Sequence, residues 1–291
     1  MTSNYVFSRV FALRANTRLN TALAGNRTDL MKFPLFQIDA FTNHLFGGNP
    51  AAVVLLESWL PDEVLAAIAA ENNLAETAFV IPGANEISLR WFTPTVEVDL
   101  CGHATLAAAY VLFQHFTPSA KELTFTTRSG KLVVTQDADR LTMDFPTRPG
   151  VPIEVSEQLV SALGVRPREA FLARDLLVVL DRESDVKNFQ PDYSRIAALD
   201  AFAVIVSAPG EAVDFVSRFF APAAGIPEDP VTGSAHCTLV PYWAERLGKS
   251  SLTAKQLSAR RGDVSCRLSG DRVFISGSAV EYLRGEIGVV V

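Results

Sequence analysis

A carboxyl side chain at the edge of an apolar segment is the first group in this sequence that could do acid–base chemistry. Glu76 stands between an alanine-rich segment, 61–73, and the apolar run 77–81. Apolar surroundings raise the pKa of a carboxyl group, and a pKa near neutrality suits a general acid or base. A solvated Glu at a helix end is the alternative interpretation, because most Glu side chains lie at protein surfaces.

A thiol and an imidazole stand together further along the chain. Cys101, Gly102 and His103 precede an apolar stretch, and a helix is expected to begin at Gly102. The dipole at a helix N-terminus disfavours a positive charge, so the His103 ring is expected to be neutral. The same backbone N–H groups would lower the pKa of the Cys101 thiol. A small buried apolar role for this cysteine is the alternative.

Residues 228–236 form a third cluster, in which carboxylates and hydroxyls precede a second expected helix start at Gly233. Glu228 and Asp229 supply the carboxylates, and Thr232 and Ser234 supply the hydroxyls. Helix capping alone would also explain the two hydroxyls. Asp229, which precedes a proline, is equally typical of a turn.

The second and third clusters follow two copies of one pattern. The sequence Arg-Trp-Phe-Thr-Pro occupies 90–94, and Arg-Phe-Phe-Ala-Pro occupies 218–222. Each is followed by a loop and a glycine at an expected helix start, an order that indicates duplication. Free N–H groups at a helix N-terminus bind anions, so two such termini could hold a substrate carboxylate from opposite sides of a cleft. Close helix–sheet packing is the structural alternative for the small residues.

The remaining patterns predict an α+β protein with two pseudo-symmetric domains, each a curled sheet around a central helix. Helices are expected at 61–73, 156–163 and 193–199. Strands are expected at 35–41, 51–56, 77–81, 87–92, 123–127, 131–136, 141–145, 176–180, 203–206 and 273–276. The chain-breaking segment 146–152 is the expected boundary. We therefore expect an N-terminal lobe of residues 31–147, completed by a C-terminal strand at 278–291, and a C-terminal lobe of residues 148–277.

The composition excludes several classes of partner. The 291 residues are 48% hydrophobic and carry a formal net charge of −6, with no basic stretch interleaved with aromatics, so nucleic acid is not an expected partner. Apolar runs stay well below the ~18–20 residues that a membrane span requires, so no membrane residence is expected. No glycine-rich nucleotide motif occurs, and no cofactor is predicted.

Cysteine and histidine usage indicates neither disulfide bonds nor a metal site. The three cysteines (Cys101, Cys237 and Cys266) form no disulfide framework, which indicates a reducing compartment and a cytoplasmic location. The four histidines are scattered and show no metal-binding motif, so no metal is predicted.

The first thirty residues differ from the rest. Residues 1–30 contain four arginines and a single acidic residue. Such a segment is expected to be a leader peptide or sequence upstream of a start codon at Met31, and the second interpretation is favoured because no cleavage signal is recognisable.

Four motifs occur in a fixed order along the chain. They are Asn-Pro-Ala-Ala-Val-Val at 49–54, Glu-Thr-Ala-Phe at 76–79, Cys-Gly-His-Ala-Thr at 101–105 and Glu-Asp-Pro-Val-Thr-Gly-Ser-Ala-His at 228–236. From about Phe36 to the C-terminus, the chain resembles the PhzF (phenazine biosynthesis-like) family of the diaminopimelate-epimerase-like superfamily. The resemblance implies a cofactor-independent isomerase, a homodimer, and a site between two lobes that binds a small carboxylate-bearing substrate.

The resemblance also implies residue roles. Glu76 is expected to shuttle the proton, and His103, Asp229 and Ser234 are expected to orient the substrate. The predicted catalytic residues are Glu76, Asp229 and His103, and the predicted substrate-binding residues are Gly102, Gly233, Ser234, Thr232 and Cys101.

One departure from related enzymes bears on the mechanism. Related epimerases and proline racemase use two cysteines, and Cys101 stands where the first would be. Thr232 stands where the second would be, and Cys237 lies about one helical turn beyond Ser234, so a two-thiol racemase is disfavoured. Two alternatives stay open: a cysteine-dependent amino-acid racemase or epimerase that uses Cys101, and a non-catalytic protein that binds a small acid.

Overall fold

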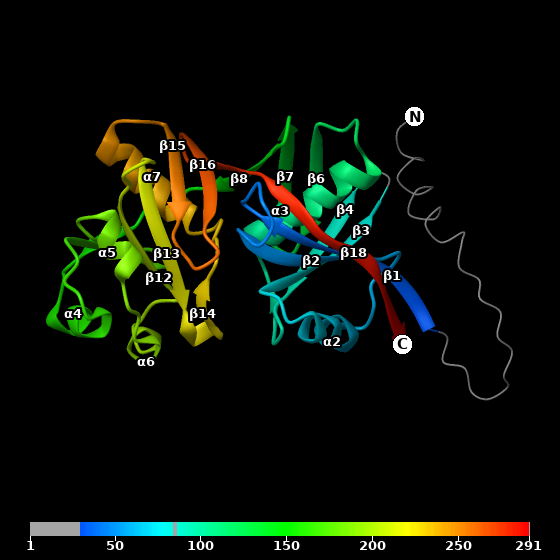
Figure 1. Cartoon of the computed structure of the whole chain (residues 1–291), viewed down its shortest axis with the longest axis horizontal. Coiled ribbons are helices and arrows are strands. Elements are labelled where there is room, and N and C mark those ends of the chain that lie inside the picture. Colours follow the sequence, from blue (N-terminus) through cyan, green and yellow to red (C-terminus); the bar gives the residue numbers. More distant parts are fainter. Residues whose placement is uncertain (1–29, 84–85, 291) are drawn as a thin grey trace, which may run out of the picture. The chain divides into compact units, whose positions relative to one another are not determined.

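The computed structural model describes residues 30–83 and 86–290. The predicted leader, apart from its last residue, lies outside the described residues. Strands outnumber helices along the chain, which has an α+β fold (Figure 1). Every helix within the described part of the chain is too short or too polar to cross a bilayer.

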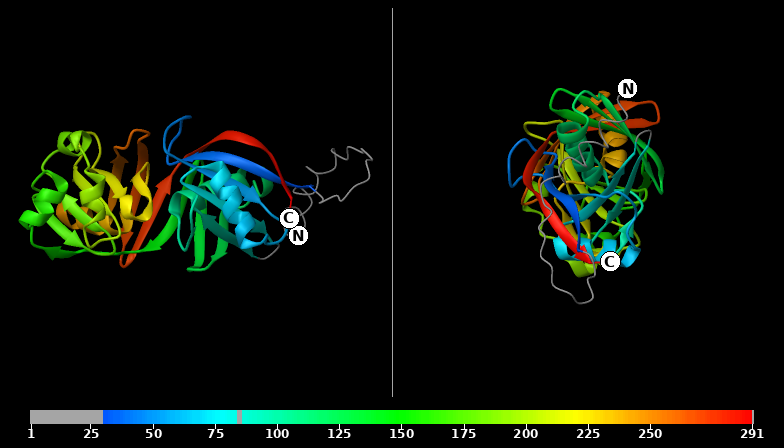
Figure 2. Two further views of the ribbon diagram at one scale, coloured as in Figure 1. Left: turned by 90° about the horizontal axis from the view of Figure 1, so that it is seen from below. Right: turned by 90° about the vertical axis from the view of Figure 1, so that its right-hand side faces the viewer.

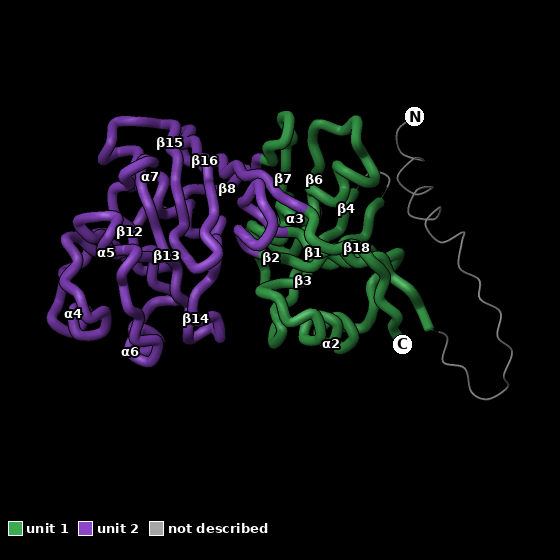
Figure 3. Tube along the Cα trace, viewed as in Figure 1, with its two compact units in different colours: residues 1–38, 50–141, 281–291 green, residues 39–49, 142–280 purple. Residues whose placement is uncertain are grey.

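The chain folds as two compact units (Figure 3). Unit 1 contains the described parts of 1–38, 50–141 and 281–291, and unit 2 contains 39–49 and 142–280. Each unit is therefore built from segments that are far apart in the sequence.

Unit 1 is a sheet with one buried helix and one covering helix. Its elements, some of which continue into unit 2, are β1 (Leu30–Ala40), β2 (Asn49–Leu55), α2 (Asp62–Asn72), β3 (Glu76–Pro82), β4 (Ile87–Phe92), β5 (Glu97–Val98), α3 (Gly102–Val111), η1 (Leu112–Phe116), β6 (Glu122–Thr127), β7 (Gly130–Asp137), β8 (Arg140–Pro146) and β18 (Ala279–Val290). Strand β1 pairs with β2 and with β18, which runs alongside it in Figures 1 and 2.

The two helices of unit 1 differ in burial because their sequences differ. In α3, nine of the ten residues are buried, and four of these are alanines whose small side chains let strands approach closely. Helix α2 buries only one face: Leu65, Ile68 and Ala69 pack with Phe79 of β3 and Phe92 of β4.

Unit 2 repeats this arrangement with a different set of covering helices. Its elements are β9 (Val151–Ile153), α4 (Glu157–Leu163), β10 (Glu169–Leu172), β11 (Leu176–Val179), α5 (Glu183–Asn188), α6 (Tyr193–Ala197), β12 (Val204–Pro209), β13 (Phe215–Ala221), η2 (Pro222–Ala224), β14 (Ile226–Asp229), α7 (His236–Leu247), β15 (Ser251–Gln256), β16 (Gly262–Ser269) and β17 (Arg272–Gly277). On the buried face of α7, the Trp243 ring stacks on Phe215 with centroids 5.7 Å apart, and its Nε1 donates to Ser207.

The two units share one order of strand pairing. In unit 1, β2 is parallel to β3, β3 is antiparallel to β4, and β4 pairs antiparallel with the short β5 and parallel with β6. In unit 2, β11, β12, β13, β14 and β15 pair in the same senses and in the same order. The buried helices α3 and α7 stand at the same place in this order. This common topology is the structural form of the duplication that the repeated motif predicts.

The repeated arginines make equivalent contacts. Arg90 of β4 donates two hydrogen bonds of 2.7 Å to Glu97 of β5. Arg218 of β13 donates to Glu228 of β14 at 2.7 and 2.9 Å. In each unit a forked ion pair thus joins the long central strand to the short strand that precedes the buried helix.

The predicted start of the second central helix is wrong by three residues. Helix α7 begins at His236, whereas Gly233, Ser234 and Ala235 form a turn. The N–H groups of 236–238 bond to the carbonyls three residues earlier, so this turn is wound more tightly than an α-helix. By contrast, α3 begins at Gly102 as predicted.

Candidate active site

Glu76 is placed by the junction between α2 and β3. Helix α2 ends at Asn72 and is capped by Asn73, whose backbone is left-handed (φ 49°), and β3 begins at Glu76 opposite Ala51 of β2. Asn72 donates a side-chain hydrogen bond to Thr77 and so braces the junction. Glu76 is only 8% exposed, so it is not the solvated helix-end residue of the alternative interpretation.

Glu76, His103 and Cys101 form a buried cluster in unit 1, which we call the triad. His103 Nε2 lies 3.2 Å from Glu76 Oε2, and Cys101 Sγ lies 3.5 Å from His103 Nδ1. Burial lowers the pKa of His103 to about 3, so the ring is neutral at pH 7. The sequence predicted a neutral ring, and desolvation is its physical cause.

The start of α3 holds the other two members of the triad in place. Cys101 is the N-cap residue, and its carbonyl accepts hydrogen bonds from the N–H and the hydroxyl of Thr105. Gly102 is the first helical residue and is itself buried. The N–H groups of this first turn have no partner within the helix, so they are suited to hold negative charge.

The triad contains donor types that metals use, but its contacts do not converge on one ring nitrogen. A thiol sulfur, an imidazole nitrogen and a carboxylate oxygen lie within 4.8 Å of one another. The thiol, however, contacts Nδ1 and the carboxylate contacts Nε2 of the same ring. Through these two contacts the ring bridges the thiol and the carboxylate.

Unit 2 contains a second buried polar cluster, centred on Asp229. Asn49 Nδ2 donates to its Oδ1 at 2.7 Å, and the Thr232 hydroxyl donates to its Oδ2 at 2.5 Å. Asp229 is 8% exposed, and desolvation raises its pKa to about 6, although these two hydrogen bonds oppose the rise. Asp229 therefore changes protonation state close to neutral pH.

Gln256 fixes the turn that follows Asp229. Its Oε1 accepts from the N–H of Thr232 at 2.8 Å, and its Nε2 donates to the carbonyl of Asp229 at 2.8 Å. His236, at the start of α7, has Nδ1 2.9 Å from the carbonyl of Thr232. Burial lowers the pKa of His236 to about 4, so this ring is also neutral. Gly233 is buried and Ser234 is half-buried in the turn.

The structure thus gathers the predicted residues into two groups. Glu76, Cys101, Gly102 and His103 lie together in unit 1, and Asp229, Thr232, Gly233 and Ser234 lie together in unit 2. Asn49 and Gln256 were missed as members of the second group. A polar amide side chain at the start of the apolar strand 49–55 could have indicated a role for Asn49 in the site. No pattern in the sequence indicates such a role for Gln256.

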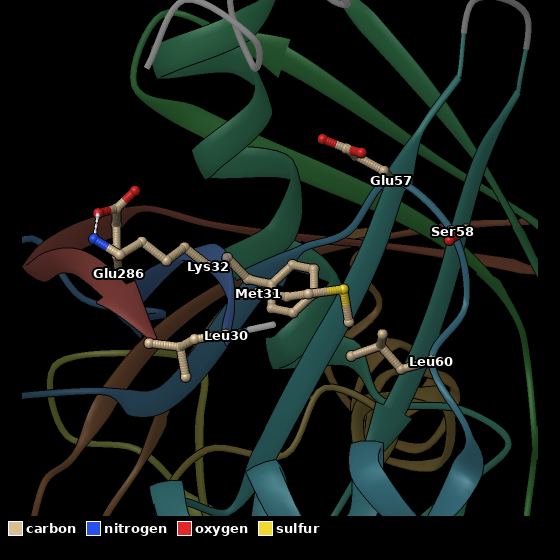
Figure 4. Close-up of a pocket in the computed structure, with 8 residues that line it drawn as sticks. Leu30, Met31, Lys32, Glu57, Ser58, Leu60 and Glu286 are labelled. Atoms are coloured by element: carbon tan, nitrogen blue, oxygen red, sulfur yellow. Dashed lines mark ion pairs between the residues drawn. The ribbon is translucent and has the colours of Figure 1, made fainter. Parts of the chain in front are cut away.

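A cavity of about 420 Å³ opens elsewhere on unit 1 (Figure 4). It is lined by Leu30, Met31, Lys32, Phe33, Glu57, Ser58, Leu60 and Glu286. Lys32 lies 3.9 Å from Glu286 at its edge. None of the predicted site residues that the structure describes lines this cavity.

Comparison with known proteins gives a consistent result. The family model for phenazine biosynthesis-like proteins matches residues 38–285. An uncharacterized isomerase of Pseudomonas aeruginosa is 49% identical over 257 residues, which cover 88% of this chain and 99% of that protein. Phenazine biosynthesis-like domain-containing protein 2 of mouse is 41% identical over 286 residues, with coverage of 88% and 99%.

Solved structures agree with the sequence matches. A PhzF-family protein of Enterococcus faecalis superposes with a TM-score of 0.86 at 47% identity, covering 88% of this chain and 99% of that one. A hydroxyproline epimerase of Agrobacterium vitis shares the fold alone, with a TM-score of 0.58 at 10% identity over 89% of this chain and 93% of that one. With its epimerase-like α+β fold and its sequence match over most of its length, the chain belongs to the phenazine biosynthesis-like (PhzF) family and is an isomerase.

Proposed function

We propose that this isomerase shifts a proton on a small carboxylate-bearing substrate, with Glu76 as the general acid/base. The observation that carries the proposal is the buried Glu76 carboxyl, 3.2 Å from a neutral imidazole. A carboxylate with little hydration is a stronger base than one in water, because burial disfavours its charge.

The duplication supports a mechanism with one base. Thr77, the residue after Glu76, pairs with Phe92 of the first Arg-containing motif, and Val204 pairs with Phe220 of the second. In this register the counterpart of Glu76 is Ala203. Because the second copy of the strand has no acid at this position, a single carboxyl must both remove and return the proton. Such a mechanism suits a proton shift on one face of a substrate better than racemisation, which exchanges protons on two faces.

The remaining groups supply binding and charge stabilisation. We assign the N–H groups at the start of α3 and in the turn 233–235 to negative charge on the substrate. Asp229, with a pKa of about 6, is protonated in part of the population near neutrality and then donates a hydrogen bond to a carboxylate. Thr232 and Ser234 complete this binding group. A proton shift changes no net oxidation state, so these acid–base groups suffice without a cofactor.

The test is isotope exchange in a variant that keeps the shape of Glu76. A panel of small carboxylic acids is incubated with the enzyme in D2O, and loss of substrate C–H signals is followed by NMR. Glu76→Gln is expected to fold normally but to lose exchange by at least ~10³-fold, whereas Glu71→Gln, on the exposed face of α2, retains it. Full exchange by Glu76→Gln rules Glu76 out as the base.

A cysteine-dependent epimerase is the second candidate, favoured by the position of Cys101 at the N-cap of α3. The second thiol that such an enzyme requires is missing from the Asp229 cluster, where the hydroxyl of Thr232 is already committed to Asp229. Cys237 does not replace it, because burial raises its pKa to about 11. Inactivation by iodoacetamide that is abolished in Cys101→Ser supports this candidate. Tight binding of a carboxylic acid without exchange supports a non-catalytic protein instead.

A further inference from the structure

The two neighbours of His103 in the triad contact different nitrogens of its ring. Cys101 Sγ approaches Nδ1 of His103, and Glu76 Oε2 approaches Nε2 of the same ring. A neutral imidazole has one N–H donor and one nitrogen lone pair, so each tautomer suits a different pair of neighbours. The Nε2–H form offers its proton to the carboxylate and its lone pair to the thiol. The Nδ1–H form would point a lone pair at the carboxylate, which repels it.

From this arrangement we infer that Cys101 is a positioning residue, whose S–H donates to Nδ1 of His103 and thereby directs the Nε2–H proton toward Glu76. The role of Cys101 in setting the His103 tautomer does not depend on the proposed function. Its effect on catalysis does rest on the proposed function, because Glu76 matters to catalysis only if it is the base.

Burial makes this small contact effective. Cys101 is 6% exposed and His103 3% exposed, so little water can reach Nδ1 to compete with the thiol. A buried nitrogen lone pair without a donor carries a desolvation penalty, and the thiol relieves that penalty in only one tautomer. The hydrogen bond that one ring nitrogen makes therefore sets the state of the other.

A thiol also fits this position better than a hydroxyl group does. The sulfur stands 3.5 Å from the nitrogen, a separation normal for sulfur and too long for a strong hydroxyl hydrogen bond.

The test reads the tautomer of His103 directly, in the full-length protein without added ligand. Multiple-bond ¹H–¹⁵N NMR of histidine-labelled protein distinguishes the Nδ1–H form from the Nε2–H form, and His103→Gln identifies the signals of this ring. Glu76→Gln is included because its amide can accept or donate, so it no longer dictates the tautomer. Cys101→Val keeps the side-chain volume without a donor, and Cys101→Ser restores one.

The wild type and Glu76→Gln are both expected to hold the Nε2–H form. In the Glu76→Gln, Cys101→Val double variant, the ratio of Nδ1–H to Nε2–H is expected to rise about tenfold, and serine at position 101 is expected to reverse part of that rise. Cys266→Val, which removes a buried thiol of unit 2, leaves the ratio unchanged. The inference is overturned by an Nδ1–H ring in the wild type, or by equal ratios in Glu76→Gln with and without the thiol.

A kinetic measurement separates this inference from the proposed function. Cys101→Val is expected to lower kcat for exchange about tenfold with KM nearly unchanged, and Cys101→Ser to recover part of it. If Glu76→Gln retains exchange while the tautomer follows Cys101, the proposed function fails and the inference stands. If Glu76→Gln loses exchange but the tautomer ignores Cys101, only the inference fails.

Discussion

The hydroxyl of Thr232 donates a 2.5 Å hydrogen bond to Oδ2 of Asp229, and this bond opposes the effect of burial on the carboxyl group. Desolvation raises the pKa of Asp229 to about 6 even with this bond and that of Asn49 in place. The protonation of Asp229 is therefore set by a balance that single substitutions can shift.

Removal of the Thr232 hydroxyl is expected to raise the pKa of Asp229 further. Thr232→Val leaves one carboxylate oxygen without its donor, which disfavours the charged form. The pKa is measured by ¹³C NMR titration of the aspartate carboxyl carbons, with Asp229→Asn used to identify the signal. Thr142→Val, which breaks a hydroxyl contact with Ser276 elsewhere in unit 2, is the control. A pKa that stays constant or falls in Thr232→Val contradicts the assignment.

Asp229 is also expected to make the protein less stable as the pH rises. Its pKa is 3.8 in the unfolded chain and about 6 in the fold, so the folded state binds more protons between these values. The free energy of unfolding therefore falls as the pH rises through this window, by about 3 kcal/mol from this group. Urea unfolding of the wild type and of Asp229→Asn at pH 4, 5, 6 and 7 measures the difference. The prediction is contradicted if the free energy of unfolding of the wild type increases relative to that of Asp229→Asn as the pH rises.

His236 is expected to act in the opposite sense. Its pKa falls from 6.5 to about 4 on folding, so its contribution is complete above pH 6.5 and is lost as the pH falls toward 4. That loss amounts to about 3 kcal/mol. His236→Gln keeps an N–H donor for the carbonyl of Thr232 and is expected to be less sensitive to acid in urea unfolding. His44→Gln, at an exposed histidine, should retain the acid sensitivity of the wild type.

The two arginine forks offer a matched pair of substitutions. Lysine cannot make two parallel hydrogen bonds to one carboxylate, so Arg90→Lys and Arg218→Lys are each expected to lower the free energy of unfolding by about 1–2 kcal/mol. The effect should be larger for Arg218, which also donates to the carbonyls of Phe189 and Val186. Arg284→Lys, at an exposed site, is expected to have no measurable effect. An equal decrease in the free energy of unfolding in all three variants would show that the two forked ion pairs do not stabilise the fold more than an exposed arginine does.

The sequence predicted those parts of the site that local patterns encode. The position of Glu76 follows from a helix signal that stops just before an apolar strand, and the start of α3 follows from a glycine before an apolar stretch. The start of α7 was misplaced because a glycine-led turn of i→i+3 bonds resembles a helix start in sequence. The backbone hydrogen-bond pattern distinguishes such a turn from a helix start, and the amino-acid composition does not show that pattern.

Other features depend on contacts between distant segments. Gln256 meets the Asp229 turn from the end of β15, and no local pattern announces this. Strands β15 and β16 were missed because their alternation places serine, threonine, cysteine and glycine among the apolar residues, which weakens a period-two signal. Helix α5 was missed because it buries only Val186.

The bond between Asn49 and Asp229 joins residues separated by 180 positions, and β1 pairs with a strand that begins at Ala279. During synthesis, neither unit can complete its core until almost the whole chain has left the ribosome. Contacts at such long sequence separation slow the search for the native state. Until β18 emerges, β1 has an open edge, and a nascent chain in that condition is exposed to aggregation and is a natural client for chaperones.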